Sequence, residues 1–184
     1  MNADFLLIQK MKQGEEEAFD VFVRKYYGEI LRYCGYHCPD REYAEDLTQE
    51  TFLHFFAKLS EYHYMGKTRN YLYTIAGNLC RDFYRKKKDM PTEAGELEKS
   101  AVSAPLDNVL EQMDVEAAVK SLLPELRDIV ILYYFQGLKM REVADVLQIS
   151  LSLVKYRLQQ AKKQLGQKLG EEGVYEAGRE TFDI

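Results

Sequence analysis

Apolar and polar positions alternate with a helical period over most of the chain. Aromatic and aliphatic side chains recur every three or four residues over 19–31, 41–59 and 68–87, which is the period of one helix face. Gly14 follows LLIQKMKQ and precedes the first stripe, where a helix C-terminus is expected, and Asp40 stands between the first two stripes, where an N-cap is expected. No segment alternates with the period of two that is typical of strands. The pattern therefore predicts an all-α fold.

The second half of the chain continues this pattern in shorter segments. Pro124 suits the first turn of a helix that runs to Gly137, because proline is favoured at a helix start and glycine just past its end. MREVADVL (140–147), the turn residues QIS and a longer segment at 151–169 follow. Two short amphipathic helices joined by a tight turn predict a helix-turn-helix, although an ordinary helical hairpin has the same pattern.

Charge divides the 184 residues into four segments. The chain carries 25 Lys and Arg against 30 Asp and Glu, a net charge of −5. Residues 1–90 are neutral, 91–115 carry −5, 116–170 carry +4 and 171–184 carry −4. The excess acid lies in a Pro-containing connector and a tail, so the overall acidity does not argue against binding to nucleic acid.

A polar cluster at the middle of the 41–59 helix exceeds what a core requires. Asp46, Gln49 and Glu50 are spaced i, i+3 and i+4, which places them on one side of a helix, away from its apolar stripe. One interpretation is a solvated face, and another is a docking patch for a basic partner. These residues alone do not form a facing set of metal ligands.

The helix at 68–87 combines rings with positive charge. Lys67 to Lys88 contains seven basic residues and one acid, interleaved with Tyr71, Tyr73 and Tyr84. Cations can follow a phosphate backbone while rings stack on unpaired bases. The alternative is a surface helix with half-buried tyrosines and a solvated basic end.

The second helix of the helix-turn-helix presents a polar and basic outer face. In this motif the second helix enters the major groove and reads base edges with its N-terminal residues, while neighbouring cations meet phosphate. The expected DNA-binding residues are Ser150, which also suits an N-cap, and Ser152, Lys155, Tyr156, Arg157, Gln159, Gln160, Lys162 and Lys163.

Other chemistry is sparse. Cys34, Cys38 and Cys80 lack the second ligand pair of a zinc finger, so we expect reduced thiols in a cytoplasmic protein and no metal or cofactor. No segment approaches the length of apolar sequence that a membrane span needs. We see no phosphate-binding glycine loop, no HExxH and no plausible Ser/His/Asp set, and therefore expect no enzymatic activity.

Three segments resemble the sigma factors of bacterial RNA polymerase, and specifically their compact extracytoplasmic-function (ECF) group. These segments are AEDLTQETFLHFFAKL (44–59), NYLYTIAGNLCRDFYRKKK (70–88) and the stretch from Leu122 to Leu165. The resemblance implies a sigma-2 domain at 1–90, a linker at 91–114, a sigma-4 helix-turn-helix domain at 115–170 and an acidic tail at 171–184.

The resemblance also implies a role for each surface. In this family the second segment captures bases of the −10 promoter element, the last helix reads the −35 element, and the first segment grips the coiled coil of the polymerase β′ subunit. Residues expected to bind core polymerase are Asp46, Leu47, Gln49, Glu50 and Leu53. Residues expected at the −10 element are Arg69, Asn70, Tyr71, Asn78, Arg81, Arg85, Lys86 and Lys87. An anti-sigma factor is a further expected partner, without insertion of this chain into a membrane.

The chain departs from the family pattern at several positions. Tyr71 stands where Trp is typical, Thr68 replaces a common aromatic, and Gln148 occupies a turn position that often holds Gly. Ser152 and Tyr156 replace smaller residues, so the −35 sequence preference does not transfer. Two other functions stay open from the residues alone. One is a stand-alone helix-turn-helix regulator with a helical sensor or dimerisation domain, and the other is a helical adaptor.

Overall fold

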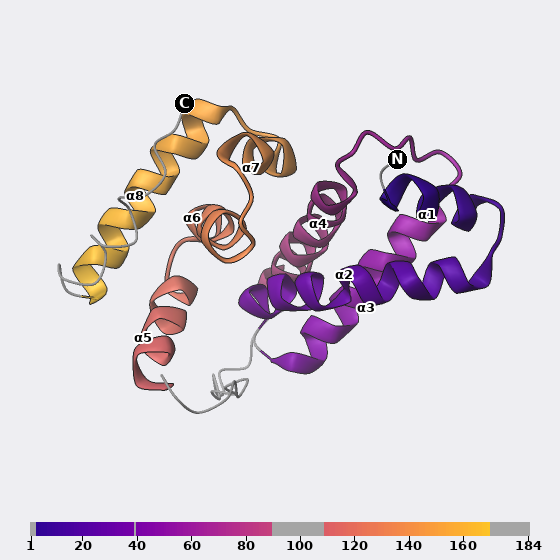
Figure 1. The fold of residues 1–184 in the computed structure, drawn as a ribbon. Helices are drawn as coiled ribbons and strands as arrows, with labels where there is room; N and C mark the ends of the chain where they lie inside the picture. Colours follow the sequence, from indigo (N-terminus) through magenta and orange to yellow (C-terminus); the bar gives the residue numbers. More distant parts are fainter. Residues whose placement is uncertain (1–2, 39, 90–108, 170–184) are drawn as a thin grey trace. The chain divides into compact units, whose positions relative to one another are not determined.

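The computed structural model describes residues 3–38, 40–89 and 109–169, with the side chains of Tyr84, 86–89 and 109–114 left out. Within these ranges every regular element is a helix, which confirms the predicted all-α class (Figure 1). The chain forms two compact units, Met1–Val102 and Ser103–Ile184. The division falls inside the segment predicted as a linker.

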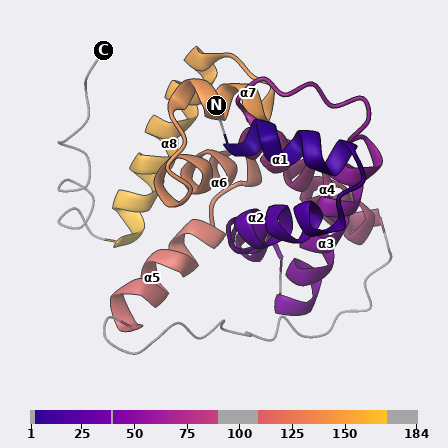
Figure 2. The same ribbon diagram turned by 45° about the vertical axis from the view of Figure 1, so that its right-hand side comes forward.

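In the described part of the first unit there are four helices, α1 (Ala3–Lys12), α2 (Glu16–His37), α3 (Arg41–Ala57) and α4 (Thr68–Asp89). Helices α2, α3 and α4 pack against one another, and α1 packs on α2 (Figure 2). Phe22 and Phe55 are fully buried and stack with 4.8 Å between ring centroids. Aromatic residues contribute large apolar area, so this cluster is the main core of the unit.

The predicted helix ends of the first unit agree with the backbone. Gly14 has a φ of +83° just after α1, a conformation that glycine adopts without strain. The backbone N–H of Tyr43 donates to the Asp40 carboxylate at 3.0 Å, so Asp40 caps α3 as predicted. Helix α3 ends at Ala57, two residues before the predicted end, because the chain turns at Lys58. Leu59 stays buried beyond that turn.

The second unit contains α5 (Val109–Lys120), α6 (Pro124–Val130), a π-helical turn η1 (Ile131–Phe135), α7 (Met140–Leu147) and α8 (Leu151–Leu169). Helix α8 packs on α5, α6 and α7 (Figure 2). Pro124 lies at the start of α6, as predicted. The sequence predicted a single helix from Pro124 to Gly137, but its second half is π-helical. There the Gln136 N–H donates to the Ile131 carbonyl at 2.9 Å. This π register keeps Ile131, Leu132 and Gln136 all buried.

The predicted linker and tail fall largely outside the described residues. Helix α5 begins at Val109, so the last six residues assigned to the linker are helical. Tertiary packing explains this helix, because α5 packs on α6 and α8 and buries Ala118 and Val119. None of the helices in the described ranges has the length and apolar content to cross a membrane.

Candidate protein and nucleic-acid interfaces

Helix α3 exposes a ridge that we name the α3 patch, formed by Asp46, Gln49, Glu50 and Leu53. Their spacing of i, i+3, i+4 and i+7 places them on one helix face. Leu53 is 67% exposed, which is unusual for a large aliphatic side chain in the middle of a helix. Two carboxylates, an amide and an apolar side chain on one ridge suit a partner that is basic and offers an apolar contact.

Leu47 does not belong to this surface, although the sequence predicted it there. Its side chain is 6% exposed and lies on the core side of α3. Thr48 and Thr51 are also fully buried on that side, and their hydroxyls donate to the carbonyls of Ala44 and Leu47. The apolar face of α3 therefore packs in the core, and the opposite ridge is the side that a partner can contact.

Tyr71 lies near the start of α4 and is half-buried. Its ring stacks on Tyr62 with 5.2 Å between centroids and an interplanar angle of 22°. The Tyr62 hydroxyl contacts the hydroxyl of Thr68 at 3.3 Å, and burial raises the pKa of Tyr62. Phe55 meets the edge of Tyr71 at 6.0 Å. The ring is thus supported from below while part of it faces solvent, as a stacking platform requires.

Arg69 and Asn70 are less available than the sequence predicted. The Arg69 guanidinium pairs with Glu29 of α2 at 2.7 Å and lies 5.6 Å from the Tyr73 ring centroid. Asn70 is only 8% exposed and Tyr73 is fully buried. Burial raises the pKa of Tyr73 to about 12. Helix α4 packs on both α2 and α3, so these residues hold α4 in place rather than face a ligand.

One face of the second half of α4 is exposed. The side chains of Asn78, Arg81 and Arg85 all face solvent. Arg81 donates to the Asn78 amide oxygen at 2.6 Å, and Arg85 forms an exposed pair with Asp82 at 3.1 Å. An exposed ion pair such as Arg85–Asp82 contributes little stability, so it presents only a small barrier to pairing with phosphate. Lys86 and Lys87 are predicted DNA contacts whose side chains lie outside the described residues.

The sequence analysis assigned no function to the loop between α3 and α4, although Tyr62 in this loop stacks on Tyr71. Met65 is 82% exposed, and Gly66 has a φ of +75°. The loop ends at Lys67, directly before the helix that carries Tyr71. An aromatic run followed by Met-Gly-Lys was the available signal, but the loop has no helical period and was not assigned a role.

The turn between α7 and α8 has the geometry of a helix-turn-helix. Gln148 adopts the left-handed conformation, with a φ of 54° and a ψ of 42°, as its position in the sequence predicted. The Leu153 N–H donates to the Ser150 hydroxyl at 3.2 Å, so Ser150 caps α8. Val154 is fully buried under the turn, whereas Ile149 is half-buried.

Beyond the cap, α8 exposes most of the predicted DNA-binding side chains. Tyr156 is 57% exposed, and Gln160 donates to its hydroxyl at 2.5 Å. Arg157 and Lys162 are half-buried, and the Lys162 amine lies 5.8 Å from the ring centroid of Tyr134. We name the exposed set the α8 face; it comprises Ser152, Lys155, Tyr156, Gln159, Gln160 and Lys163.

The three cysteines lie together in the core of the first unit. Cys34, Cys38 and Cys80 are free thiols, and all are buried. Hydrogen bonds with Cys34 and Cys38, together with burial, raise the pKa of Cys80. Among the described residues, no group of three or more His, Cys, Asp or Glu side chains has the arrangement of a metal site.

Comparison with known proteins assigns both units. Residues 22–89 match the family described as Sigma-70 region 2, and residues 112–165 match Sigma-70, region 4. The ECF sigma factor BldN of Streptomyces coelicolor is 33% identical over 152 residues, which cover 77% of this chain and 56% of BldN. The ECF sigma factor SigW of Bacillus subtilis is 28% identical over 181 residues, which cover 88% of this chain and 94% of SigW. The chain thus spans little more than half the length of the first relative and nearly all of the second.

Two solved structures share the fold. CnrH, in complex with the cytosolic domain of CnrY, superposes with a TM-score of 0.72 at 21% identity, covering 93% of this chain and 99% of CnrH. RpoE from Bartonella quintana, in complex with the anti-sigma factor NepR, also gives a TM-score of 0.72 at 21% identity, covering 82% of this chain and 96% of RpoE.

Proposed function

Because the chain belongs to the ECF group of the sigma-70 family, we propose that it is a promoter-specificity subunit of RNA polymerase. In this proposal the unit with α1 to α4 binds core polymerase and the −10 element, and the unit with α5 to α8 reads the −35 element. The role is one of binding and positioning, and the polymerase supplies the catalysis.

The observation that carries the proposal is the occurrence of two solvent-facing surfaces of unlike chemistry on two separate units. The α3 patch offers carboxylates and an exposed leucine, which suits a basic protein surface. The α8 face offers hydroxyl, amide and basic groups after a capped turn, which suits the edges of base pairs and phosphate. A stand-alone regulator would need only the second surface.

Helix α4 supplies the proposed −10 contact. Tyr71 would receive an unpaired base on the part of its ring that is not covered by Tyr62. Asn78 would lie with Tyr71 in the segment that captures bases, and Arg81 and Arg85 would lie along the adjoining DNA. A base held outside the duplex favours strand opening because its stacking with the neighbouring bases has already been lost.

We also propose an anti-sigma partner and a cytoplasmic site of action. CnrH and RpoE have been solved with a partner domain or an anti-sigma factor, and the exposed α3 patch and α8 face are surfaces that such a partner could cover. A protein encoded by a neighbouring gene should co-purify with this chain and block its transcription in vitro, and the absence of such a protein would contradict this part of the proposal.

Reversal of charge on the α3 patch tests the central function. Asp46→Lys together with Glu50→Lys should abolish binding to core polymerase at micromolar concentration and stop promoter-dependent transcription. The unfolding temperature should stay unchanged, because both carboxylates are exposed, and binding of the free chain to duplex DNA should not become weaker. Asp20→Lys, a single exposed reversal on α2, is the control for positive charge added outside the α3 patch. Unaltered transcription by the double variant would favour the stand-alone regulator instead.

The promoter itself can be found by mapping transcript start sites after overproduction of the protein. A shared pair of sequence elements upstream of the induced starts is the expected result. The absence of any induced start would contradict the proposed role.

A further inference from the structure

A lysine of α1 reaches across the first unit to the loop that precedes α4. The Lys12 ammonium donates to the main-chain carbonyls of Ser60, at 3.2 Å, and Tyr62, at 2.8 Å. We propose that Lys12 is a positioning residue for capture of the −10 base: it fixes Tyr62, and Tyr62 in turn fixes the ring of Tyr71. This inference rests on the proposed function, since it concerns how the −10 surface is held.

The contacts form a continuous path from α1 to α4. Lys12 holds the main chain at Tyr62, whose ring stacks on Tyr71 at 5.2 Å and whose hydroxyl meets Thr68 at 3.3 Å. Thr68 is buried at the start of α4. A shift of the Tyr62 backbone would therefore move the surface on which the Tyr71 ring rests.

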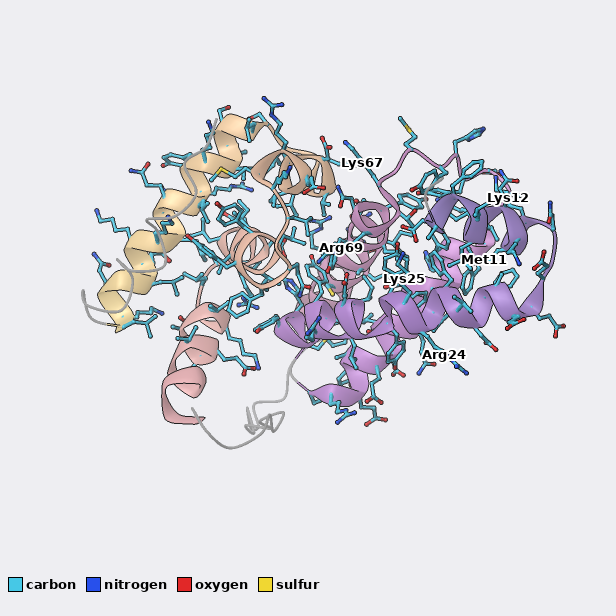
Figure 3. All side chains as sticks on the ribbon, viewed as in Figure 1. Met11, Lys12, Arg24, Lys25, Lys67 and Arg69 are labelled. Atoms are coloured by element: carbon cyan, nitrogen blue, oxygen red, sulfur yellow. The ribbon has the colours of Figure 1, made fainter. Side chains whose placement is uncertain are left out.

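Helix α1 is itself anchored, so the ammonium has a fixed base. Ile8 and Met11 are each 2% exposed, and Asp4 accepts a hydrogen bond of 2.8 Å from the Tyr26 hydroxyl of α2. Phe5 also packs on Tyr64 of the loop, with 5.8 Å between ring centroids. Figure 3 labels Met11 and Lys12 on this helix, with Lys67 at the other end of the loop.

The chemistry favours a cation at this place. Ser60 and Tyr62 lie three and five residues beyond the end of α3, and the carbonyl of each accepts a hydrogen bond from the Lys12 ammonium. Hydrogen bonds from an ionised donor are about twice as strong as neutral ones. Gly66, in the left-handed region, and the exposed Met65 place the far half of the loop in solvent. Lys12 therefore contacts the half of the loop that contains Tyr62, on which the Tyr71 ring stacks.

Helix α1 lies outside the part of the chain that matches Sigma-70 region 2, which begins at residue 22. The positioning role of Lys12 is therefore not inferred from that match. It follows from the hydrogen bonds between α1 and the loop.

The test uses the full chain assembled with core polymerase. The probe is a promoter fragment from the mapped start sites, with its −10 element unpaired and carrying 2-aminopurine at the captured base. Lys12→Met keeps the apolar stem and removes the donor. It should weaken binding of the fragment, followed by the change in 2-aminopurine fluorescence, about fivefold to tenfold, the scale of one hydrogen bond. Lys12→Arg should recover most of the signal.

Lys10→Met is the matched control. Lys10 lies on the same helix, pairs with Glu15 at 3.0 Å on the surface, and carries the same charge. The Lys10→Met variant should bind the fragment as the wild type does. Core binding and binding to a duplex −35 fragment should be equal in all variants.

Each other result has a separate meaning. Equal base capture by Lys12→Met and wild type would overturn the inference and leave the proposed function intact. Parallel loss of core binding and −35 binding in Lys12→Met would mean general damage and would also overturn it. Failure of the wild type to capture the base would contradict the proposed function instead.

Discussion

Gly77 permits the close approach of α2 and α4. A Cβ atom at this position would lie 2.9 Å from the Tyr33 hydroxyl oxygen. Tyr33 is completely buried, so its ring cannot turn aside without repacking the core of the first unit. Gly77 therefore sets the distance between the helix that carries the proposed −10 contacts and its support.

Replacement of Gly77 by Ala should destabilise the first unit by about 1–2 kcal/mol, because overpacking exceeds the gain in helix propensity. Differential scanning calorimetry of the full chain measures the change. Gly28→Ala is the control, since its added Cβ meets nothing within 4 Å in the middle of α2, and it should stabilise by up to about 1 kcal/mol. Equal effects of the two substitutions would contradict the close-contact explanation.

Tyr73 makes the first unit sensitive to alkaline pH. Burial raises its pKa from 10.0 to about 12, so the unfolded chain loses this proton at lower pH than the folded one. Stability from this group is fully present below pH 10 and falls as the pH rises through 12, by about 2–3 kcal/mol. Chemical denaturation at a series of pH values should show this decrease, and Tyr73→Phe should lessen it. An identical pH dependence in Tyr73→Phe would rule out this tyrosine as the cause.

At the scale of elements, the turn before α8 carries local backbone strain. Gln148 has a φ of 54°, a region that costs a non-glycine residue about 1 kcal/mol. Gln148→Gly should therefore stabilise the second unit by about 0.5–1 kcal/mol, as calorimetry would detect. Gln148→Val should destabilise it, because a β-branched side chain tolerates this conformation poorly. The reverse order of the two variants would contradict the left-handed turn.

Helix limits were predictable because their signals are local. Asp40 and Pro124 act through their own backbone neighbourhood, so the sequence alone located the starts of α3 and α6. The π-helical turn η1 was not predictable in this way. It depends on how Ile131, Leu132 and Gln136 all find buried positions against α6 and α7, which is a property of packing.

The exposure of site residues was predictable only where residue type agrees with helix face, with apolar residues on the packed side and polar residues opposite. On α3 the spacing alone separated Asp46, Gln49 and Glu50 from the core. On α4, polar and aromatic residues also lie on the packed side, where Tyr73 meets Tyr33 of α2 with 5.3 Å between ring centroids. Asn70 and Tyr73 are therefore buried, although their residue types suggested a nucleic-acid surface.

At the scale of the whole molecule, net charge gives little information on function. The total of −5 combines a neutral first half, a basic 116–170 segment and acidic segments at 91–115 and 171–184. Phosphate responds to local potential within roughly a Debye length of about 8–10 Å. The acidity of the whole chain therefore does not argue against the proposed DNA contact of the α8 face.

Two weak contacts joined by one chain should gain affinity through effective concentration. If the −10 and −35 elements are bound together, the second contact forms within a tethered complex, and its strength depends on the length of residues 91–108. Each doubling of a flexible connection costs about 0.6 kcal/mol of closure free energy, which corresponds to about threefold in affinity. The connection should therefore affect only DNA that carries both elements.

An uncharged Gly/Ser insert of the same length, placed within residues 91–108, tests this dependence. Together with core polymerase, the variant should bind a two-element promoter fragment about threefold more weakly than the wild type, as measured by fluorescence anisotropy. A fragment with only the −35 element, and one with only an unpaired −10 element, should bind the variant and the wild type equally. These two fragments are the internal controls, because neither needs both units at once. Equal weakening on all three fragments would mean that the insert disturbs the units themselves, and unchanged binding to the two-element fragment would show that the units do not engage DNA together.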